Sequence, residues 1–184
     1  MSKKVFLKGT LLLACTGLVS RIAGFFYRIF LSHAIGAEGL GLYQLILPLQ
    51  GLMAALSYTG IQSALSRLIA SRLALQEKKE AYFSLVTGIF AAVFFSAVTG
   101  FLLFRHADFF ASTILKAPGT SDLLRLTAAS IPLCAIHSCI DSYYYARKKA
   151  SVPAAVQLSE QTVRIGATSV SYTHLRAHET VLDL

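Results

Sequence analysis

Two long segments of this sequence contain no charged residue, and they limit the folds that the chain can adopt. They are residues 39–65 and 81–104. A helix needs about 20 apolar residues to cross a hydrocarbon core roughly 30 Å thick, because each residue adds about 1.5 Å. Charged residues make up 14% of the 184-residue chain, whereas soluble domains average about 25%. The sequence therefore favours an all-α polytopic membrane protein over an unusually apolar soluble helical protein.

Three further apolar segments contain a few charged residues each. The first follows a basic N-terminus, and we interpret it as a membrane helix because it is too long for a signal peptide and more apolar segments follow. The last begins near residue 152 and changes character near residue 169. We predict four complete transmembrane helices and an incomplete fifth, at residues 9–31, 39–65, 81–104, 123–146 and 152–168.

Basic residues gather in three places between the apolar segments. They precede the first helix (Lys3, Lys4 and Lys8), separate the second from the third (residues 67–79) and follow the fourth (residues 147–149). These places fall on one side if each helix crosses once, so the positive-inside rule predicts a cytoplasmic N-terminus. The net charge of +8 thus reflects topology, and we expect no nucleic-acid partner. The segment 105–122 fits a short amphipathic helix at the opposite interface or a plain loop.

The last residues, "SVSYTHLRAHETVLDL", are polar and differ from the segment before them. We interpret residues 169–184 as a non-native tail of the kind that adaptor read-through adds to a reading frame. On this interpretation residues 1–168 are the N-terminal part of a membrane protein. His174, His178 and Glu179 have a spacing that suggests metal ligands, but we attribute it to the accidental tail and expect no metal site.

The first apolar segment carries two arginines in the stretch "SRIAGFFYR", residues 20–28. Seven residues return almost to the same angle on a helix, so Arg21, Gly24 and Arg28 form one stripe, which Gly17 extends. Two interpretations stay open. Arg28 could extend to the membrane interface while Arg21 pairs with an acid such as Asp141, or both could bind an anion in a cavity, because guanidinium matches phosphate oxygens.

Three more polar rows follow helical spacing. Each fits either a structural role in helix packing or a role in lining a transport pathway. In the fourth segment His137 and Asp141 are one turn apart and could hydrogen bond. In the fifth, Glu160 and Arg164 have the spacing of an ion pair, beside Gln157 and Gln161. The second segment carries the longest row: Gln44, Pro48, Gly51, Ala55, Tyr58 and Gln62.

Motifs for nucleotide binding and catalysis do not occur in the sequence. "GAEGLGLYQ" lacks both GxGxxG and a P-loop lysine. No Ser-His-Asp, HExxH or paired-carboxylate pattern is present, so we expect neither an enzyme nor a cofactor. Cys15, Cys134 and Cys139 lie in apolar segments without CxxC spacing, which indicates small core residues.

The opening block, "KGTLLLACTGLVSRIAGFFYRIFLSHAIGAEGLGLYQLILPLQGL", resembles a branch of the multidrug/oligosaccharidyl-lipid/polysaccharide exporter superfamily. The branch is that of stage V sporulation protein B and polysaccharide biosynthesis. "SEQTVRIG" in the fifth segment resembles its Glu-Gln-x-x-Arg signature. The resemblance covers residues 1 to about 168. It implies a bacterial inner-membrane transporter of about fourteen helices in two lobes, of which this chain holds part of the first lobe.

The resemblance also implies a substrate and a binding site. Relatives include flippases for undecaprenyl-diphosphate-linked oligosaccharides, whose first helix directs arginines at the diphosphate. Ser20 and Arg21 match their Ser-Arg pair directly. Arg28 departs by one residue from the lipid II flippases, which places it closer to the sporulation branch. We therefore expect Ser20, Arg21 and Arg28 to bind diphosphate. We expect a second group to line or brace the cavity: Gly24, Gln44, Gln62, Asp141, Gln157, Glu160, Gln161 and Arg164.

Two alternatives remain beside a flippase. One is a cation-coupled multidrug exporter of the same superfamily, but such an exporter needs a buried acid where the first segment has arginines. The other is a non-transporting membrane fragment, because one incomplete lobe has no second half to move against. The sequence does not specify the glycan, the coupling ion or the process served, which could be spore cortex, cell wall or capsule.

Overall fold

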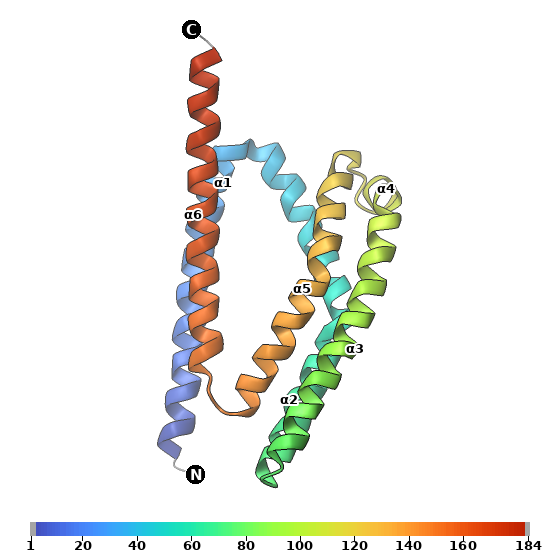
Figure 1. Ribbon diagram of the computed structural model, residues 1–184. Coiled ribbons are helices and arrows are strands. Elements are labelled where there is room, and N and C mark those ends of the chain that lie inside the picture. The colour runs from blue at the N-terminus through green and yellow to red at the C-terminus, as the bar shows by residue number, and fades with distance from the viewer. Residues whose placement is uncertain (1–2, 183–184) are drawn as a thin grey trace. The chain divides into compact units, whose positions relative to one another are not determined.

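The computed structural model describes the backbone of residues 3–182 and the side chains of residues 9–173. The described part contains helices and no strands, as predicted (Figure 1). The helices are α1 (Lys3–Ala54), α2 (Gly60–Ala74), α3 (Lys78–Arg105), α4 (Ala107–Phe109), α5 (Ser121–Ala146) and α6 (Ser151–Leu182). Two π-helical turns (Ala55–Thr59 and Phe110–Ile114) and a 3-10 turn (Pro118–Thr120) connect them. Three stretches are long and apolar enough to span a membrane: Gly9–Ala74, Lys78–Arg105 and Pro118–Ala146.

The first two predicted spans are joined more tightly than expected. Residues 32–38 were expected to form a loop, but only Gly36 interrupts the helix, with φ 74° and ψ 173°. A positive φ suits glycine, which has no Cβ to clash. The second helix then continues past residue 65 to Ala74, so Arg67 and Arg72 lie within its last turns and not in a loop.

The remaining spans agree closely with their helices. Residues 81–104 lie within α3 and residues 123–146 within α5. The predicted fifth span, residues 152–168, lies within α6, which remains helical to Leu182, and its extent as a membrane span stays a prediction. The interpretation of residues 169–184 as non-native stays a prediction. The side chains of His174, His178 and Glu179 lie outside the described residues, as do those of Lys3, Lys4 and Lys8.

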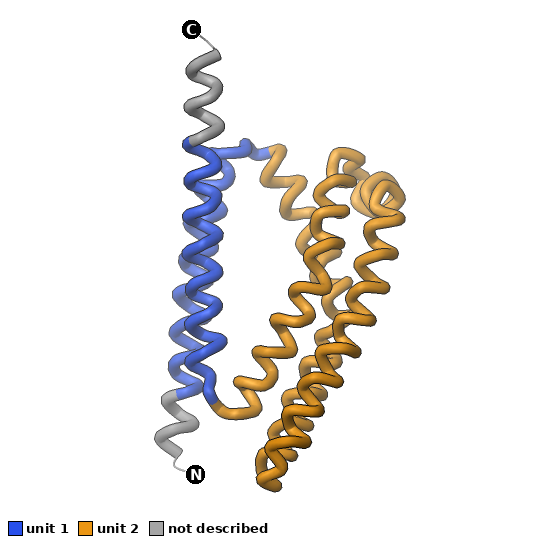
Figure 2. The backbone as a smooth tube through the Cα atoms, in the orientation of Figure 1, with its two compact units in different colours: residues 1–37, 149–184 blue, residues 38–148 orange. Residues whose placement is uncertain are grey.

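The chain divides into two compact units (Figure 2). Unit 1 comprises residues 1–37 and 149–184, so it combines the first arm of α1 with α6. Unit 2 comprises residues 38–148 and contains the second arm of α1 with α2, α3 and α5. The break at Gly36 lies one residue before the end of the first arm.

Small residues line the contact between α3 and α5 in unit 2. Small side chains let membrane helices approach closely. In lipid, dispersion contacts between closely packed helices stabilise the pair, because the hydrophobic effect does not drive their association. The buried residues recur at steps of three or four on α5 and at steps of eleven, four, four and three on α3, which places them on one face of each helix. On α3 they are Ala81, Ala92, Ser96, Gly100 and Leu103, and on α5 Leu124, Ala128, Ile131, Ala135, Cys139, Ser142 and Ala146.

The closest approach is at Gly100 of α3. A Cβ placed on Gly100 would lie 2.8 Å from the carbonyl oxygen of Ala128 and 3.8 Å from Cδ of Pro132. Proline has no N–H, so Pro132 cannot donate the helical hydrogen bond to that same Ala128 carbonyl. Gly100 thus allows the α3 backbone to cover a carbonyl that α5 leaves without its usual partner, where Cα–H contacts are favourable.

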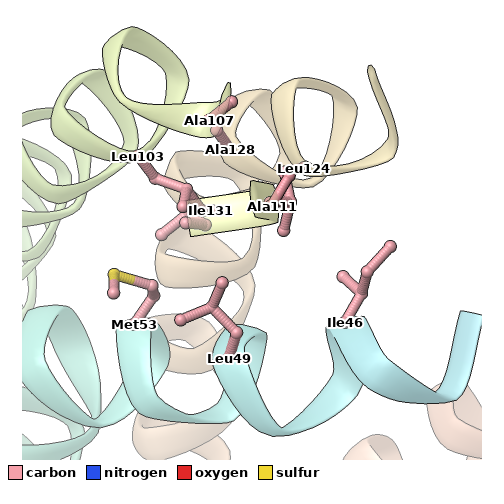
Figure 3. Packing of buried hydrophobic residues seen from close by; sticks show 9 residues of the cluster. All are labelled: Ile46, Leu49, Met53, Leu103, Ala107, Ala111, Leu124, Ala128 and Ile131. Atoms are coloured by element: carbon pink, nitrogen blue, oxygen red, sulfur yellow. The ribbon is translucent and has the colours of Figure 1, made fainter. Parts of the chain in front are cut away.

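A cluster of apolar side chains closes one end of unit 2. Its members come from the second arm of α1, the end of α3, α4, the π-helical turn Phe110–Ile114 and the first half of α5 (Figure 3). The cluster consists of Ile46, Leu49, Met53, Leu103, Ala107, Ala111, Leu124, Ala128 and Ile131. It buries one face of the α1 arm, which leaves the row with Gln44 and Pro48 exposed on unit 2.

The π-helical turn Ala55–Thr59 follows Pro48 on the same helical path. Its wider winding frees backbone carbonyls, and two hydroxyl groups bond to them. Ser57 Oγ donates to the Met53 carbonyl at 2.6 Å, and Thr59 Oγ1 donates to the Ala54 carbonyl at 3.1 Å. This local satisfaction matters in a membrane, where no water is present to replace a lost backbone bond.

The segment 105–122 is mostly short helical turns, and its place at a membrane interface stays a prediction. Arg125 of α5 holds this segment, donating to Asp108 at 2.8 Å and to Asp122 at 3.0 Å. Phe109 and Ile114 remain exposed. The cysteine prediction is confirmed for Cys139, which is buried, but it is wrong for Cys15, which is exposed.

Replacing Gly100 by alanine should destabilise unit 2. Its Cβ would meet a backbone carbonyl that cannot rotate away, so the helices must separate, and overpacking of this kind costs about 1–3 kcal/mol. Gly60→Ala is the matched control, since a Cβ there meets nothing within 4 Å and helical Gly→Ala gains about 0.5–1 kcal/mol. Thermal unfolding in detergent checks both variants. Equal shifts in midpoint would contradict the close α3–α5 contact.

Candidate functional site

The arginine stripe lies on the first arm of α1, in unit 1. Arg21 and Arg28 are exposed, and Gly24 between them is half-buried. Within unit 1 the described side chains form no ion pair with either guanidinium. The predicted stripe is therefore a row of two positive charges on one helix face, open for a ligand or for solvent.

Ser20 lies on a neighbouring face of the same arm, and this face is covered. Ser20 is 6% exposed and Thr16, one turn earlier, is 5% exposed. Thr16 Oγ1 donates to the Leu12 carbonyl at 2.8 Å. Ser20 Oγ, in contrast, is buried with no hydrogen-bond partner. A buried hydroxyl without a partner is unfavourable by about 1–3 kcal/mol, so this position is one that a polar ligand atom or a water would stabilise.

The covering element is α6, which runs parallel to the first arm of α1. Tyr27 Oη and Thr168 Oγ1 are 3.3 Å apart, and the rings of Phe30 and Tyr172 contact edge to face with centroids 5.7 Å apart. Both contacts advance in the same direction along the two helices. Because the helices rise equally per residue, this register places Ser20 level with Gln161.

Gln161 repeats the property of Ser20. Its Oε1 atom is buried and has no hydrogen-bond partner. Two polar side chains at the same level of one helix pair thus each have a buried polar atom without a partner. Buried polar groups in folded proteins are nearly always hydrogen bonded, and exceptions indicate strain, a functional role or an absent ligand or water.

The other candidate residues of α6 are exposed. Gln157, Glu160 and Arg164 all lie on its open faces. The ion pair between Glu160 and Arg164 stays a prediction. The structure gives Arg164 as a third exposed guanidinium of unit 1.

The remaining candidates lie in unit 2, on faces that its core leaves open. Gln44 is exposed and Gln62 is half-buried. The Gln62 carbonyl accepts a hydrogen bond from Ser142 Oγ at 3.1 Å, which ties α2 to α5. His137 Nδ1 lies 3.8 Å from Asp141 Oδ2, which is within ion-pair range but too long for the predicted hydrogen bond.

The described residues hold no group of three or more metal-ligating side chains. The chemistry of unit 1 is instead that of an anion site, with guanidinium groups beside hydroxyl and amide donors.

The sequence did not single out Thr168 as a partner of Tyr27. Tyr27 follows Ser20 by seven residues, so the sequence places both on one face of the helix. It does not indicate which other helix covers that face.

Comparisons with known proteins agree with this architecture. The sequence profile of a family described as "Polysaccharide biosynthesis protein" matches residues 6–177. This chain belongs to that family. It is 33% identical over 178 residues to stage V sporulation protein B of Bacillus subtilis (strain 168). The alignment covers 94% of this chain and 33% of the relative, so the chain spans about a third of the relative's length. No solved structure matches it.

Family membership together with the apolar helices makes the chain a membrane protein. The resemblance of its opening block to the sporulation and polysaccharide branch is confirmed. The candidate roles of single residues stay predictions.

Cysteine pairs test the register between α1 and α6. In a background without native cysteines, Ser20→Cys with Gln161→Cys should form a disulfide under mild oxidation. Leu18→Cys with Val163→Cys is the matched control and should not, because both side chains face outward at 60% and 68% exposure. A protease site placed in the turn between α2 and α3 reports the cross-link on a gel, because a linked chain stays in one piece. Cross-linking of the control pair alone would contradict the register.

Proposed function

We propose that this family member forms part of a flippase for lipid-linked oligosaccharides carried on undecaprenyl diphosphate. The transport moves the lipid-linked glycan across the bacterial inner membrane and involves no chemical change, so the protein is not an enzyme. The single observation that supports this most is the arginine stripe of unit 1 beside the unsatisfied Ser20 and Gln161. That site needs negative charge beside its arginines and polar partners for its uncharged side chains, and a diphosphate-linked sugar would supply both.

The first need is for negative charge. Guanidinium groups in or near a membrane are costly without a counter-charge, and within unit 1 the described side chains do not supply one to Arg21 or Arg28. A diphosphate carries several acceptor oxygens, and arginine binds such groups through two parallel hydrogen bonds. Arg21 and Arg28 would neutralise it, with Ser20 Oγ donating to one oxygen. Gly24 leaves room for the ligand between the two arginines.

The second need is for polar partners to a sugar. Gln157 and Gln161 carry amide groups that both donate and accept, and a glycan presents hydroxyl groups of both kinds. Glu160 and Arg164 would add charged partners on the same helix. For Gln44, Gln62 and Asp141 of unit 2 we keep the proposed role of cavity-lining or bracing residues in the whole transporter.

We further propose that the N-terminus lies in the cytoplasm. The basic residues of the α2–α3 turn and of residues 147–149 would then lie on the cytoplasmic side, as the positive-inside rule expects. The site would load substrate from that side and release it on the other by alternating access. A role in spore, cell-wall or capsule synthesis fits this substrate class equally well.

Substituting Arg21 by alanine should lower flipping at least tenfold, because a charge-assisted contact to phosphate is lost. Arg21→Lys should be intermediate, since lysine keeps the charge but loses the bidentate geometry. The measurement uses a chimera in which residues 1–168 replace the aligned part of the Bacillus subtilis relative. Vesicles containing the chimera and a fluorescent undecaprenyl-diphosphate-linked sugar report flipping through quenching from outside.

The matched control is Arg105→Ala, which removes an exposed arginine at the end of α3. The chimera with Arg105→Ala should flip the lipid-linked sugar at the same rate as the unaltered chimera. Equal rates for Arg21→Ala and Arg105→Ala would contradict the role of the stripe. Efflux of cationic dyes by the chimera, without flipping of the lipid, would favour a drug exporter instead.

A further inference from the structure

A groove between α2 and α3 lies in unit 2 and shares no residue with the polar site described above. It has a volume of about 580 Å³. Its walls are apolar or small, and Leu68 and Phe83 stand at its rim with 45% and 68% exposure. Only one end is charged, where Arg72 and Glu80 line it next to the short turn between the helices.

The groove has the length of one bilayer leaflet. It extends from Arg72 at the end of α2 to Ile61 near its start. That separation of eleven residues corresponds to about 16 Å of helix, roughly half the thickness of a hydrocarbon core. Arg72 also lies two residues before the end of the apolar stretch Gly9–Ala74, and the end of such a stretch is where a membrane helix meets the lipid headgroups. An apolar channel of this length, with a cation at headgroup level, has the form of a phospholipid.

The charge at this end selects the headgroup. Residues 67–80 contain four basic and two acidic side chains, which leaves a net positive charge. Arg72 Nη1 donates to Glu77 Oε2 at 2.9 Å, and a guanidinium has five N–H donors, so donors remain for a phosphate. Glu80 lines the same end of the groove, and its negative charge repels an anion. Removing that charge should therefore strengthen the binding of an anionic headgroup, whereas removing Arg72 should weaken it.

Small residues create the groove. Ala64 on α2 and Ala91 on α3 both line it. Gly88 marks the closest approach, because a Cβ there would lie 2.7 Å from Leu65 Cδ1. Larger side chains at Ala64 or Ala91 would fill the space without touching the charged end.

From these observations we propose that the α2–α3 groove binds one anionic phospholipid, with an acyl chain along the groove and the phosphate at Arg72. This site is independent of the proposed flippase activity, since it uses none of the residues of unit 1. Its occupant is a resident membrane lipid and not the transported substrate.

Native mass spectrometry of the 184-residue chain tests this, after exchange into detergent with phosphatidylglycerol or with phosphatidylcholine of the same acyl chains. One phosphatidylglycerol per chain should be retained, with at least tenfold preference over phosphatidylcholine. Arg72→Gln should abolish that preference, whereas Glu80→Gln should tighten phosphatidylglycerol binding. Ala91→Phe should remove both lipids, and circular dichroism verifies that the variant keeps its helices.

Arg67→Gln is the matched control, because it removes the same charge from the same helix, α2, but Arg67 does not line the groove. It should retain phosphatidylglycerol. An equal loss in Arg67→Gln and Arg72→Gln would overturn the proposal, because it would indicate attraction to a basic surface without a site. Retention of phosphatidylglycerol by Ala91→Phe would overturn it as well, and so would preferential retention of undecaprenyl phosphate added in competition.

Discussion

The contact between the backbones of α3 and α5 at Gly100 and Ala128 fixes the arrangement of unit 2. Pro132 removes the normal partner of the Ala128 carbonyl, and only a residue without Cβ lets α3 cover it. From this point the two helices stay close through alanine, serine and cysteine side chains. The buried residues of this seam include no aromatic side chain, and the phenylalanines of α3 lie on its outer faces. Phe90, Phe94 and Phe101 of α3 are thus more than 60% exposed, which suits lipid and would not suit water.

Unit 1 is held together by a different set of contacts. Its two helices run in parallel and meet through a hydroxyl contact and one aromatic pair, with Ser20 and Gln161 left unsatisfied between them. A protein interior that is merely structural would fill such positions with apolar residues, because these cost less to bury. The retention of polar groups here, next to two arginines, is what connects the architecture to an anionic substrate. Family membership alone would not indicate which part of the chain carries that function.

The sequence predicted the helices of unit 2 well because charge is absent from 81–104 and charged turns flank it. It failed at residues 32–38, where alanine, isoleucine and glutamate continue a helix and Gly36 alone breaks it. After residue 168 the polar composition does not end α6, which continues to Leu182 without a proline or glycine in its path. Periodicity was enough to place Arg21, Gly24 and Arg28 on one stripe. It could not show that Ser20 is covered by α6, because burial depends on the register between helices far apart in sequence.

The central claim is that the face of α1 that carries Arg21 and Arg28 binds the diphosphate of a lipid-linked glycan. A photoreactive amino acid at Gly24, between the two arginines, tests this directly in bacterial membranes. The account predicts that illumination links this position to undecaprenyl-diphosphate-linked sugars, identified by mass spectrometry, and that the yield falls when Arg21 is also replaced by alanine. Adducts with bulk phospholipid only, in amounts that do not depend on Arg21, would contradict it.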